Sequence, residues 1–453
     1  MLPGSTTTPR PGLPFGLLGL PQAPLPPMFL RLLLLLLLAA PLPAAAYSVL
    51  THQAHVDTCW RRCLRPLLEQ RYPGASREQL IEAKSYAYGG AIVQDMGYYP
   101  LGSRLFTDLT HYVRSGDFVR NLLLQAQDRD EYAFALGALA HYVADIKGHS
   151  EGTNRAMPSV YPELGQRFGP VVTYFEAPIQ HTQLEFAFDV VQLAAGRYRS
   201  DTYHDFIGFR VSKPVLERAF RDTYGLELKQ IVVDLDVSVA TFRFAVSQLI
   251  PTAARAAWHA ERDEIRRLSP RARRRDYLYE HNERRFRQEY GRGYDKPGLG
   301  ARLVSKVIKV LPKIGPLRPF AFKLPTPEAQ QLFKQSFSDV MTDYCQLLTQ
   351  TRQSQAVTPA ALPNFDFDTG KPTRVGEYDL ADETYGEWVR KLAKDKFAGV
   401  SPPVQANILS FFDGATKPPQ AEDEKEEKTL AETRQALRQL RAFKPAAPAA
   451  PGP

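Results

Sequence analysis

The sequence predicts an all-α protein, and three observations carry that prediction. Apolar residues recur at helical spacing along most of the 453-residue chain. Alternating apolar and polar runs, which mark half-buried strands, are rare. The chain contains no glycine-rich phosphate loop and no repeating order of strand and helix. Its 44% hydrophobic content is enough for a large core, so we expect one large domain with an extension.

The N-terminal 46 residues are predicted to be a leader rather than folded structure. A positive start at Arg31 precedes a leucine-rich run and a stretch of small residues that ends at Ala46. This order is typical of a signal peptide, which we place at about 28–46. Met1 and Met28 are both possible starts. No later run is long and apolar enough for a membrane helix, so the expected location is secreted or periplasmic.

Helices are expected along the first half of the mature chain. The first spans 51–70, and the second spans 76–88 and ends at Gly89-Gly90. Glycine, proline and polar residues between 151 and 172 predict a loop of the kind that borders a functional site. Gly148 should loosen the end of the helix before it. The other helices are predicted over 107–113, 117–127, 130–147, 176–195, 213–224 and 227–257.

The second half of the chain is predicted to be a mostly helical extension. Arginines crowd the span 261–313 with tyrosines between them, so this span could hold phosphates, although a solvated helical face is the simpler interpretation. Helices are expected over 326–352 and 379–398, with a loop at 363–374. The predicted divisions are a catalytic domain at 47–259, a basic extension at 260–417 and a charged, Pro/Ala-rich mobile tail at 418–453.

Charge and cysteine content limit the possible functions only loosely. The formal net charge of +8 favours anionic partners such as phosphate esters or membrane surfaces. The chain has three cysteines, and Cys59 and Cys63 lie four residues apart on a predicted helix. A bridge at that spacing would be strained, so two buried thiols are expected. Their spacing does not match a zinc-cysteine motif.

Two predicted helices carry an imidazole and a carboxylate on one face. His141, Asp145 and His149 follow one another at intervals of four residues, and His181 and Glu185 repeat that interval. A single buried histidine is more often a hydrogen-bonded core residue than a ligand. Several histidines beside carboxylates favour a metal pocket, because zinc prefers nitrogen and oxygen ligands.

In order and spacing these residues resemble the zinc-dependent phospholipase C family. Its members are all-helical enzymes with three zinc ions, and they share their fold with zinc nucleases that act on single strands. The resemblance covers approximately residues 47–193. It implies a multi-helix domain of this fold and a phosphoric diester hydrolase activity in which metal-bound water attacks phosphorus. Asp95 matches the family's aspartate and is also a candidate base.

The resemblance also implies three sets of metal ligands. One zinc ion would be held by Asp95, His111, His141 and Asp145. A second would be held by His149, His181 and Glu185. A third would be held by the terminal amine and carbonyl of Tyr47, by His52 and by the other oxygen of Asp145.

Three positions depart from the family pattern or leave a choice. Tyr47 stands where the family has tryptophan. His149 lies eight residues after His141, whereas the family's histidine lies ten residues after. His55 competes with His52.

The sequence therefore predicts a secreted zinc-dependent hydrolase, most consistent with a phospholipase C that acts on phospholipid headgroups with peripheral membrane contact. A nuclease or nucleotidase of the same fold, with nucleic acid held by the basic span, is the alternative. A third reading is a secreted zinc-binding protein without activity. The oligomeric state is left open.

Overall fold

The structure is a computed structural model that describes residues 49–99, 101–194, 209–244, 246, 262–263, 265–267, 322–415 and 423–445. These residues are predominantly helical. The only strands among them are β1 (Phe365–Asp366) and β2 (Lys371–Pro372), which pair antiparallel. The predicted all-α class is confirmed. The predicted leader, Tyr47, most of the basic span and the Pro/Ala-rich end lie outside the described residues.

The first predicted helix is interrupted. Helix α2 (Val49–Cys59) passes into the π-helical turn η1 (Trp60–Leu64), and α3 (Arg65–Arg71) follows. Pro66 lies in the first turn of α3. Because proline has no N–H to donate to the preceding turn, the wider π turn accommodates it at small cost.

Helix α4 (Arg77–Val93) does not end at Gly89-Gly90, so that prediction was wrong. A Cβ at Gly90 would lie 1.8 Å from the carbonyl oxygen of Phe134, in α7 (Arg129–Lys147). A Cβ at Gly137 of α7 would lie 2.0 Å from the carbonyl oxygen of Ala87 in α4. The two glycines therefore allow the backbones of α4 and α7 to cross in direct contact, and they serve packing rather than helix termination.

The segment predicted as a loop at 151–172 is mostly helical, which corrects that expectation. Helix α7 continues into the π turn η3 (Gly148–Thr153) and α8 (Asn154–Val160), and α9 (Pro162–Phe168) follows. Pro162 occupies the first position of α9, where its missing N–H costs nothing. Proline and glycine in this segment therefore start and join short helices. The neighbouring helices are η2 (Gln94–Tyr98), α5 (Arg104–Tyr112), α6 (Ser115–Gln125) and α10 (Pro178–Ala194).

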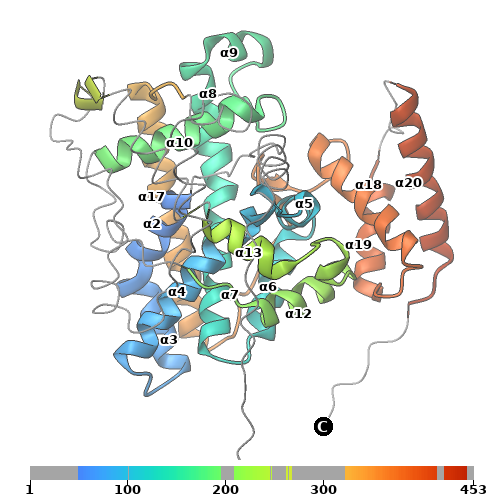
Figure 1. Cartoon of the computed structure of the whole chain (residues 1–453), viewed down its shortest axis with the longest axis horizontal. Helices are drawn as coiled ribbons and strands as arrows, with labels where there is room; N and C mark the ends of the chain where they lie inside the picture. The colour runs from blue at the N-terminus through green and yellow to red at the C-terminus, as the bar shows by residue number, and fades with distance from the viewer. Residues whose placement is uncertain are drawn as a thin grey trace, which may run out of the picture. The chain divides into compact units, whose positions relative to one another are not determined.

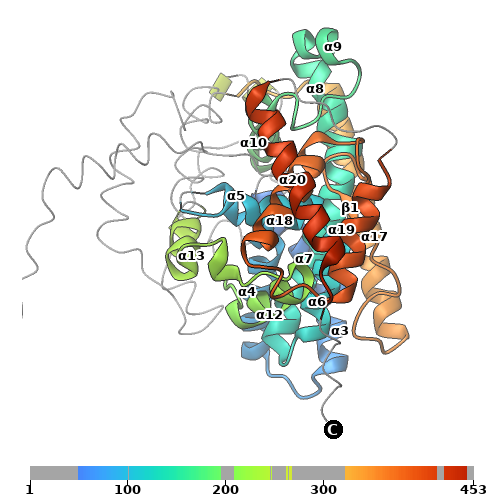
Figure 2. The same cartoon turned by 90° about the vertical axis from the view of Figure 1, so that its right-hand side faces the viewer.

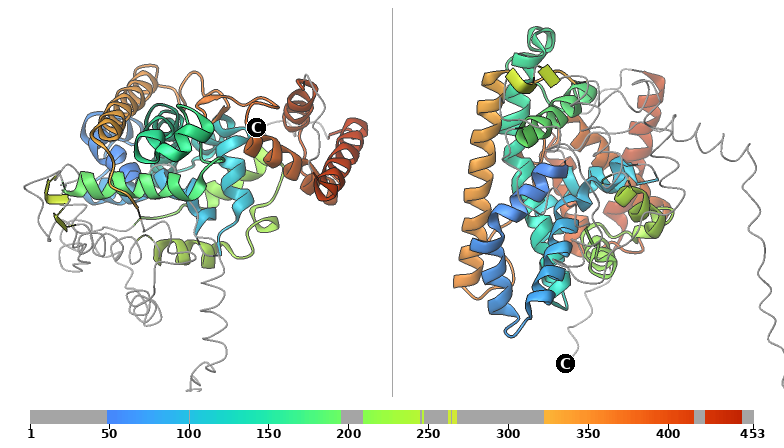
Figure 3. Two further views of the ribbon diagram at one scale, coloured as in Figure 1. Left: turned by 90° about the horizontal axis from the view of Figure 1, so that it is seen from above. Right: turned by 60° about the vertical axis from the view of Figure 1, so that its left-hand side comes forward.

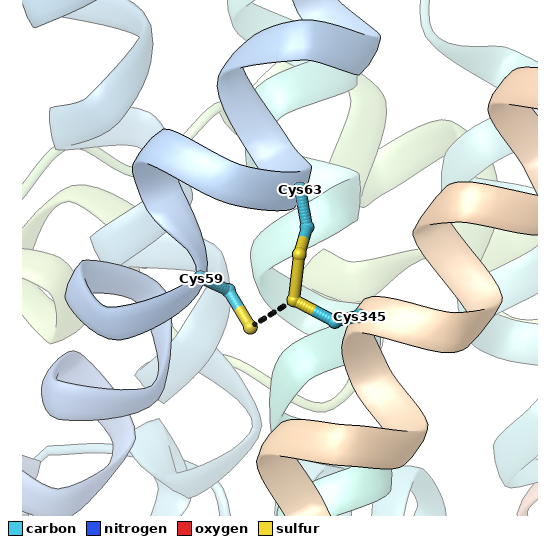
Figure 4. A group of neighbouring side chains, drawn as sticks. All are labelled: Cys59, Cys63 and Cys345. Atoms are coloured by element: carbon cyan, nitrogen blue, oxygen red, sulfur yellow. Dashed lines mark hydrogen bonds between the residues drawn. A yellow bond between two sulfur atoms is a disulfide. The ribbon is translucent and has the colours of Figure 1, made fainter.

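Helix α17 (Pro327–Gln353) joins the C-terminal part of the chain to the N-terminal helices. It contacts α2, α3, α7 and α8, and the right-hand view of Figure 3 shows it beside α2 and α3. A disulfide links Cys63 in η1 to Cys345 in α17, and Figure 4 shows Cys59 beside this bridge. Sγ of Cys59 lies 2.9 Å from Sγ of Cys345. The prediction of two thiols is correct for Cys59 and was wrong for Cys63, because Cys63 pairs with Cys345 on a helix that is distant in the sequence.

The remaining described helices include three from the C-terminal part of the chain, which Figure 1 shows next to one another. Helix α18 (Asp379–Lys394) contacts α5 and α20 (Glu424–Ala442), and α19 (Pro402–Asp413) also contacts α20, as Figure 2 shows from the side. Among the described residues, no helix has the length and apolar character needed to cross a membrane. The others are α12 (Lys213–Tyr224), η4 (Leu228–Gln230) and α13 (Leu235–Phe244).

Candidate metal centre

The structure brings the predicted ligands from distant helices into two buried groups. The first contains Asp95, His111, His141 and Asp145, and the second contains His149, His181 and Glu185. Within each group, one nitrogen or oxygen from every residue lies within 4.8 Å of all the others.

The donor atoms of the first group have the spacing of a tetrahedral site. Nε2 of His111 lies 3.4 Å from Oδ1 of Asp95, from Oδ2 of Asp145 and from Nε2 of His141. Nε2 of His141 lies 3.0 Å from Oδ2 of Asp145 and 3.9 Å from Oδ1 of Asp95. Ligand atoms about 2.0–2.1 Å from a tetrahedral zinc ion are roughly 3.3–3.4 Å apart. The three distances from His111 match that geometry, and the two from His141 lie on either side of it.

Backbone carbonyls determine which ring nitrogen of each histidine is free. Nδ1 of His141 lies 2.9 Å from the carbonyl oxygen of Ala91, and Nδ1 of His111 lies 2.8 Å from that of Thr107. A carbonyl oxygen only accepts, so both Nδ1 atoms carry the proton. Each Nε2 therefore faces the carboxylates and is the nitrogen that would bind a metal, after release of any proton it carries. This is the outer-shell arrangement typical of metal-binding histidines. The close crossing of α4 and α7 brings Ala91 to His141.

His52 lies on the other side of the Asp145 and Asp95 carboxylates. Its Nε2 lies 3.4 Å from Oδ1 of Asp145 and 4.0 Å from Oδ2 of Asp95, so these oxygens face away from the first group. His52 stacks on His141 with ring centroids 4.3 Å apart. His55, the competing residue, instead stacks on Phe337 of α17. The structure therefore places His52 against the carboxylates.

The second group depends on the π turn η3. His149 lies in this turn and stacks on His181 with ring centroids 5.1 Å apart. A π turn is wider than an α turn, so it shifts His149 relative to the stripe expected for a continuous α-helix. Helix α10 supplies His181 and Glu185, and Nδ1 of His181 lies 2.8 Å from Oε1 of Glu185. Asn154 of α8 accepts a hydrogen bond from Nε2 of His181 at 2.8 Å.

Buried carboxylate oxygens without hydrogen bonds indicate that cations belong here. Among the described residues, both oxygens of Asp95, Asp145 and Glu185 are buried and make no hydrogen bond. Leaving such a group unsatisfied costs about 1–3 kcal/mol, and more when it is charged. A bound cation would remove that cost. Imidazole nitrogens and carboxylate oxygens are ligands that zinc prefers, so these residues fit zinc ions.

Burial and neighbouring charges shift the pKa values of several of these residues. Burial would lower the pKa of His111, but Asp145 and Asp95 outweigh it and raise the pKa to about 10. Burial raises the pKa of Glu185 well above its usual range, and Asp145 adds to that effect. Burial and His149 lower the pKa of His181 to about 3.

The comparison with protein families agrees with this geometry. Residues 51–231 match the family model described as zinc dependent phospholipase C. The resemblance predicted from the sequence is thereby confirmed over this region. The zinc dependent phospholipase C match contains every predicted ligand except Tyr47, which lies outside both the match and the described residues. No curated protein and no solved structure matches the chain.

Several residues near the candidate metal ligands were missed by the sequence analysis. Asp189 of α10 accepts hydrogen bonds from Thr51 Oγ1 at 2.6 Å and from the Leu50 N–H at 3.3 Å, so it fixes the start of the helix that carries His52. Phe367 and Asp368 come from the hairpin outside the family match. No local pattern marks these residues, because their partners are far away in the sequence.

Proposed function

We propose that the chain is an exported zinc-dependent phosphodiester hydrolase, specifically a phospholipase C that acts on phospholipid headgroups. The observation that carries this proposal is the group of Asp95, His111, His141 and Asp145. Its donor atoms have tetrahedral spacing, and it lies inside the region that matches the phospholipase C family. The buried carboxylate oxygens of this group make no hydrogen bond, and a bound cation would explain their burial.

Up to three zinc ions are proposed, with ligands assigned as the family resemblance implies. Bound zinc would neutralise phosphate oxygens and lower the pKa of a water molecule. The first ion would be held by the tetrahedral group, the second by His149, His181 and Glu185, and the third by Tyr47, His52 and Oδ1 of Asp145.

Asp95 is proposed as the general base. Its two oxygens are buried, make no hydrogen bond and face different histidines, His111 and His52. One oxygen can therefore serve as a ligand while the other receives a proton. Asp95 lies in the short helix η2, directly after α4, so the crossing of α4 and α7 determines its position.

Exposed apolar side chains favour a lipid substrate over nucleic acid. The rings of Tyr98 and Tyr174 contact each other at 6.2 Å, and each also contacts a candidate ligand, His111 or His181, at 5.9 Å. The loop that follows Tyr98 and the loop that contains Tyr174 also carry exposed apolar residues. Such exposure beside a site is typical of a membrane or lipid contact. The exposed residues are Leu101 on the first loop, and Val171, Phe175 and, at the start of α10, Ile179 on the second.

Export is supported by the disulfide and by the predicted signal peptide. The bridge between Cys63 and Cys345 is stable in an oxidising compartment, whereas cytosolic proteins rarely keep such bonds. The alternative nucleic-acid function rests on the basic span, most of which lies outside the described residues.

Parallel assays on phosphatidylcholine vesicles and single-stranded DNA test the proposal. We expect the vesicles to release phosphocholine and to accumulate diacylglycerol. A chelator should abolish this activity, and added zinc should restore it. Cleavage of DNA alone would instead support the nuclease. Stoichiometric zinc without turnover of either substrate would support a binding protein and would contradict the proposal.

A further inference from the structure

A hairpin from outside the family match lies against the candidate metal centre. It is formed by β1 and β2, and we call residues 363–378 the strap. The Phe367 N–H donates to the carbonyl oxygen of His111 at 3.2 Å, and the Phe367 ring lies 5.1 Å from the His111 ring. Tyr142 of α7 donates to the carbonyl oxygen of Pro363 at 2.7 Å. The strap is thus bound to the two helices that carry His111 and His141.

Asp368 of the strap points a buried carboxylate at the second ligand group. The residue is 2% exposed. Its Oδ2 accepts hydrogen bonds from Tyr112 at 3.1 Å and from Tyr378. Its Oδ1 lies 3.0 Å from Nδ1 of His149. Two phenols therefore hold one oxygen of the carboxylate, and the other oxygen faces His149.

This contact decides the proton position on His149. A lone pair on Nδ1 would be repelled by a carboxylate oxygen at 3.0 Å, so Nδ1 carries the proton. Nε2 of His149 is then the nitrogen available as a ligand. Carboxylates that pair with the distal nitrogen of a metal-binding histidine also fix the orientation of its ring.

Asn154 determines which ring nitrogen of His181 carries the proton. Its Nδ2 donates to the carbonyl oxygen of Asp368 at 2.7 Å. Because a carbonyl oxygen only accepts, the amide nitrogen must face it, and the amide oxygen must face His181. That oxygen lies 2.8 Å from Nε2 of His181, so Nε2 carries the proton. Nδ1 of His181 and Oε1 of Glu185 then face each other at 2.8 Å with no hydrogen bond between them, a repulsive contact that a bound cation would relieve.

We propose that Asp368 is a positioning residue of the second metal group. It sets the tautomer of His149 through its carboxylate and that of His181 through its backbone carbonyl and Asn154. The strap lies after residue 231, so this control comes from the part of the chain beyond the family match. The proposal rests on the proposed zinc-dependent function, since it assigns residues to a zinc site.

Zinc binding to purified full-length protein tests the proposal without an activity assay. Asp368→Asn keeps the shape of the side chain and removes its charge. In competition titrations with a chromophoric chelator, we expect the affinity for one zinc ion to fall about 10–100-fold, with the other ions unaffected. Tyr142→Phe is the matched control. It removes one hydrogen bond that anchors the strap and leaves the Asp368 carboxylate in place, so its zinc affinity should stay within about twofold of the wild type.

Nitrogen NMR of histidine-labelled wild-type protein keeps the proposal testable if the variant fails to fold. The His149 signal, assigned by its loss in His149→Gln, should show a protonated Nδ1 and a bare or zinc-bound Nε2. A bare Nδ1, or unchanged zinc affinity in a folded Asp368→Asn variant, would overturn the role of Asp368 alone. Absence of zinc binding by the wild type would instead overturn the proposed function.

Discussion

Oδ1 of Asp145 lies 3.4 Å from Nε2 of His52, while Oδ2 of the same carboxylate lies 3.0 Å from Nε2 of His141. A carboxylate with imidazoles on both sides and no hydrogen bond has the geometry of a bridge between two cations. Burial alone would raise the pKa of Asp145, but His141 and His52 outweigh it and lower the pKa well below its usual range. The carboxylate is therefore ionised and ready to bind a cation.

The first prediction concerns this bridge. Asp145→Asn should remove two of the bound zinc ions and lower phosphodiesterase activity by about 100-fold or more, since even outer-shell losses cost about 10–100-fold. Metal analysis of the purified variant measures the stoichiometry. A variant that keeps the wild-type number of zinc ions would show that Asp145 is not a shared ligand.

The second prediction separates His52 from His55. His52→Gln should lose one zinc ion, because its Nε2 faces the carboxylates of Asp145 and Asp95. His55→Gln is the matched control. Its ring stacks on Phe337, so zinc content should be unchanged even if the protein becomes less stable. The reverse pattern, measured by the same metal analysis, would assign the ligand to His55.

The third prediction is that zinc binding releases protons. In the metal-free protein the pKa of His111 is about 10, so its imidazole is protonated at pH 7, and the raised pKa of Glu185 favours its protonated form. Zinc requires both groups deprotonated, so zinc affinity should increase as pH rises from about 6 to 8.

Calorimetric titrations at one pH, in two buffers with different ionisation enthalpies, measure this release. The difference in heat should correspond to at least one proton for each protein molecule. Equal heats in the two buffers would contradict the prediction.

The fourth prediction uses the three neighbouring sulfur atoms. Cys345→Ser removes any bridge between η1 and α17 and should lower the free energy of unfolding by about 2–5 kcal/mol. Cys63→Ser should cost less, because Cys59 lies 2.9 Å from Cys345 and can take over the pairing. Burial raises the pKa of the Cys59 thiol to about 12, so Cys59 should stay unreactive in the wild type.

Urea denaturation and disulfide mapping by mass spectrometry measure these differences. Cys59→Ser serves as the control and should keep the wild-type bridge. Equal destabilisation by Cys63→Ser and Cys345→Ser would show that Cys59 cannot replace Cys63.

The fifth prediction concerns the exposed apolar loops. Phe175→Ser should lower activity on phospholipid vesicles about 10–100-fold, since burying an aromatic side chain contributes about 1.5–3 kcal/mol. Activity on a soluble short-chain phospholipid should not change. Leu124→Ser is the control, because Leu124 is also exposed but lies on α6, outside these loops. Equal losses on both substrates would assign Phe175 a role in the site itself.

The sequence by itself determined the helical class and the ligands that share a helix. His181 and Glu185 lie four residues apart, and helical geometry alone places them on one face. The order of histidines and carboxylates, with the family resemblance, was enough to predict both ligand groups. The helical class and the four-residue intervals are local features, so a single stretch of sequence contains the information they require, whereas the grouping of residues from different helices came from the resemblance.

Only the tertiary structure decided how the groups are held. The sequence predicted a helix end at Gly89-Gly90, whereas in the structure Arg210 and Phe134 pack against these glycines. The π turn at His149 could not be predicted, because its spacing reflects packing rather than propensity.

The partners of Cys63 and of His149 lie 282 and 219 residues further along the chain, at Cys345 and Asp368. Contacts at such separations depend on the packing of the whole chain, and no periodic pattern near either residue indicates them. This is why the candidate ligands could be named from the sequence, whereas the residues that contact them from distant parts of the chain could not.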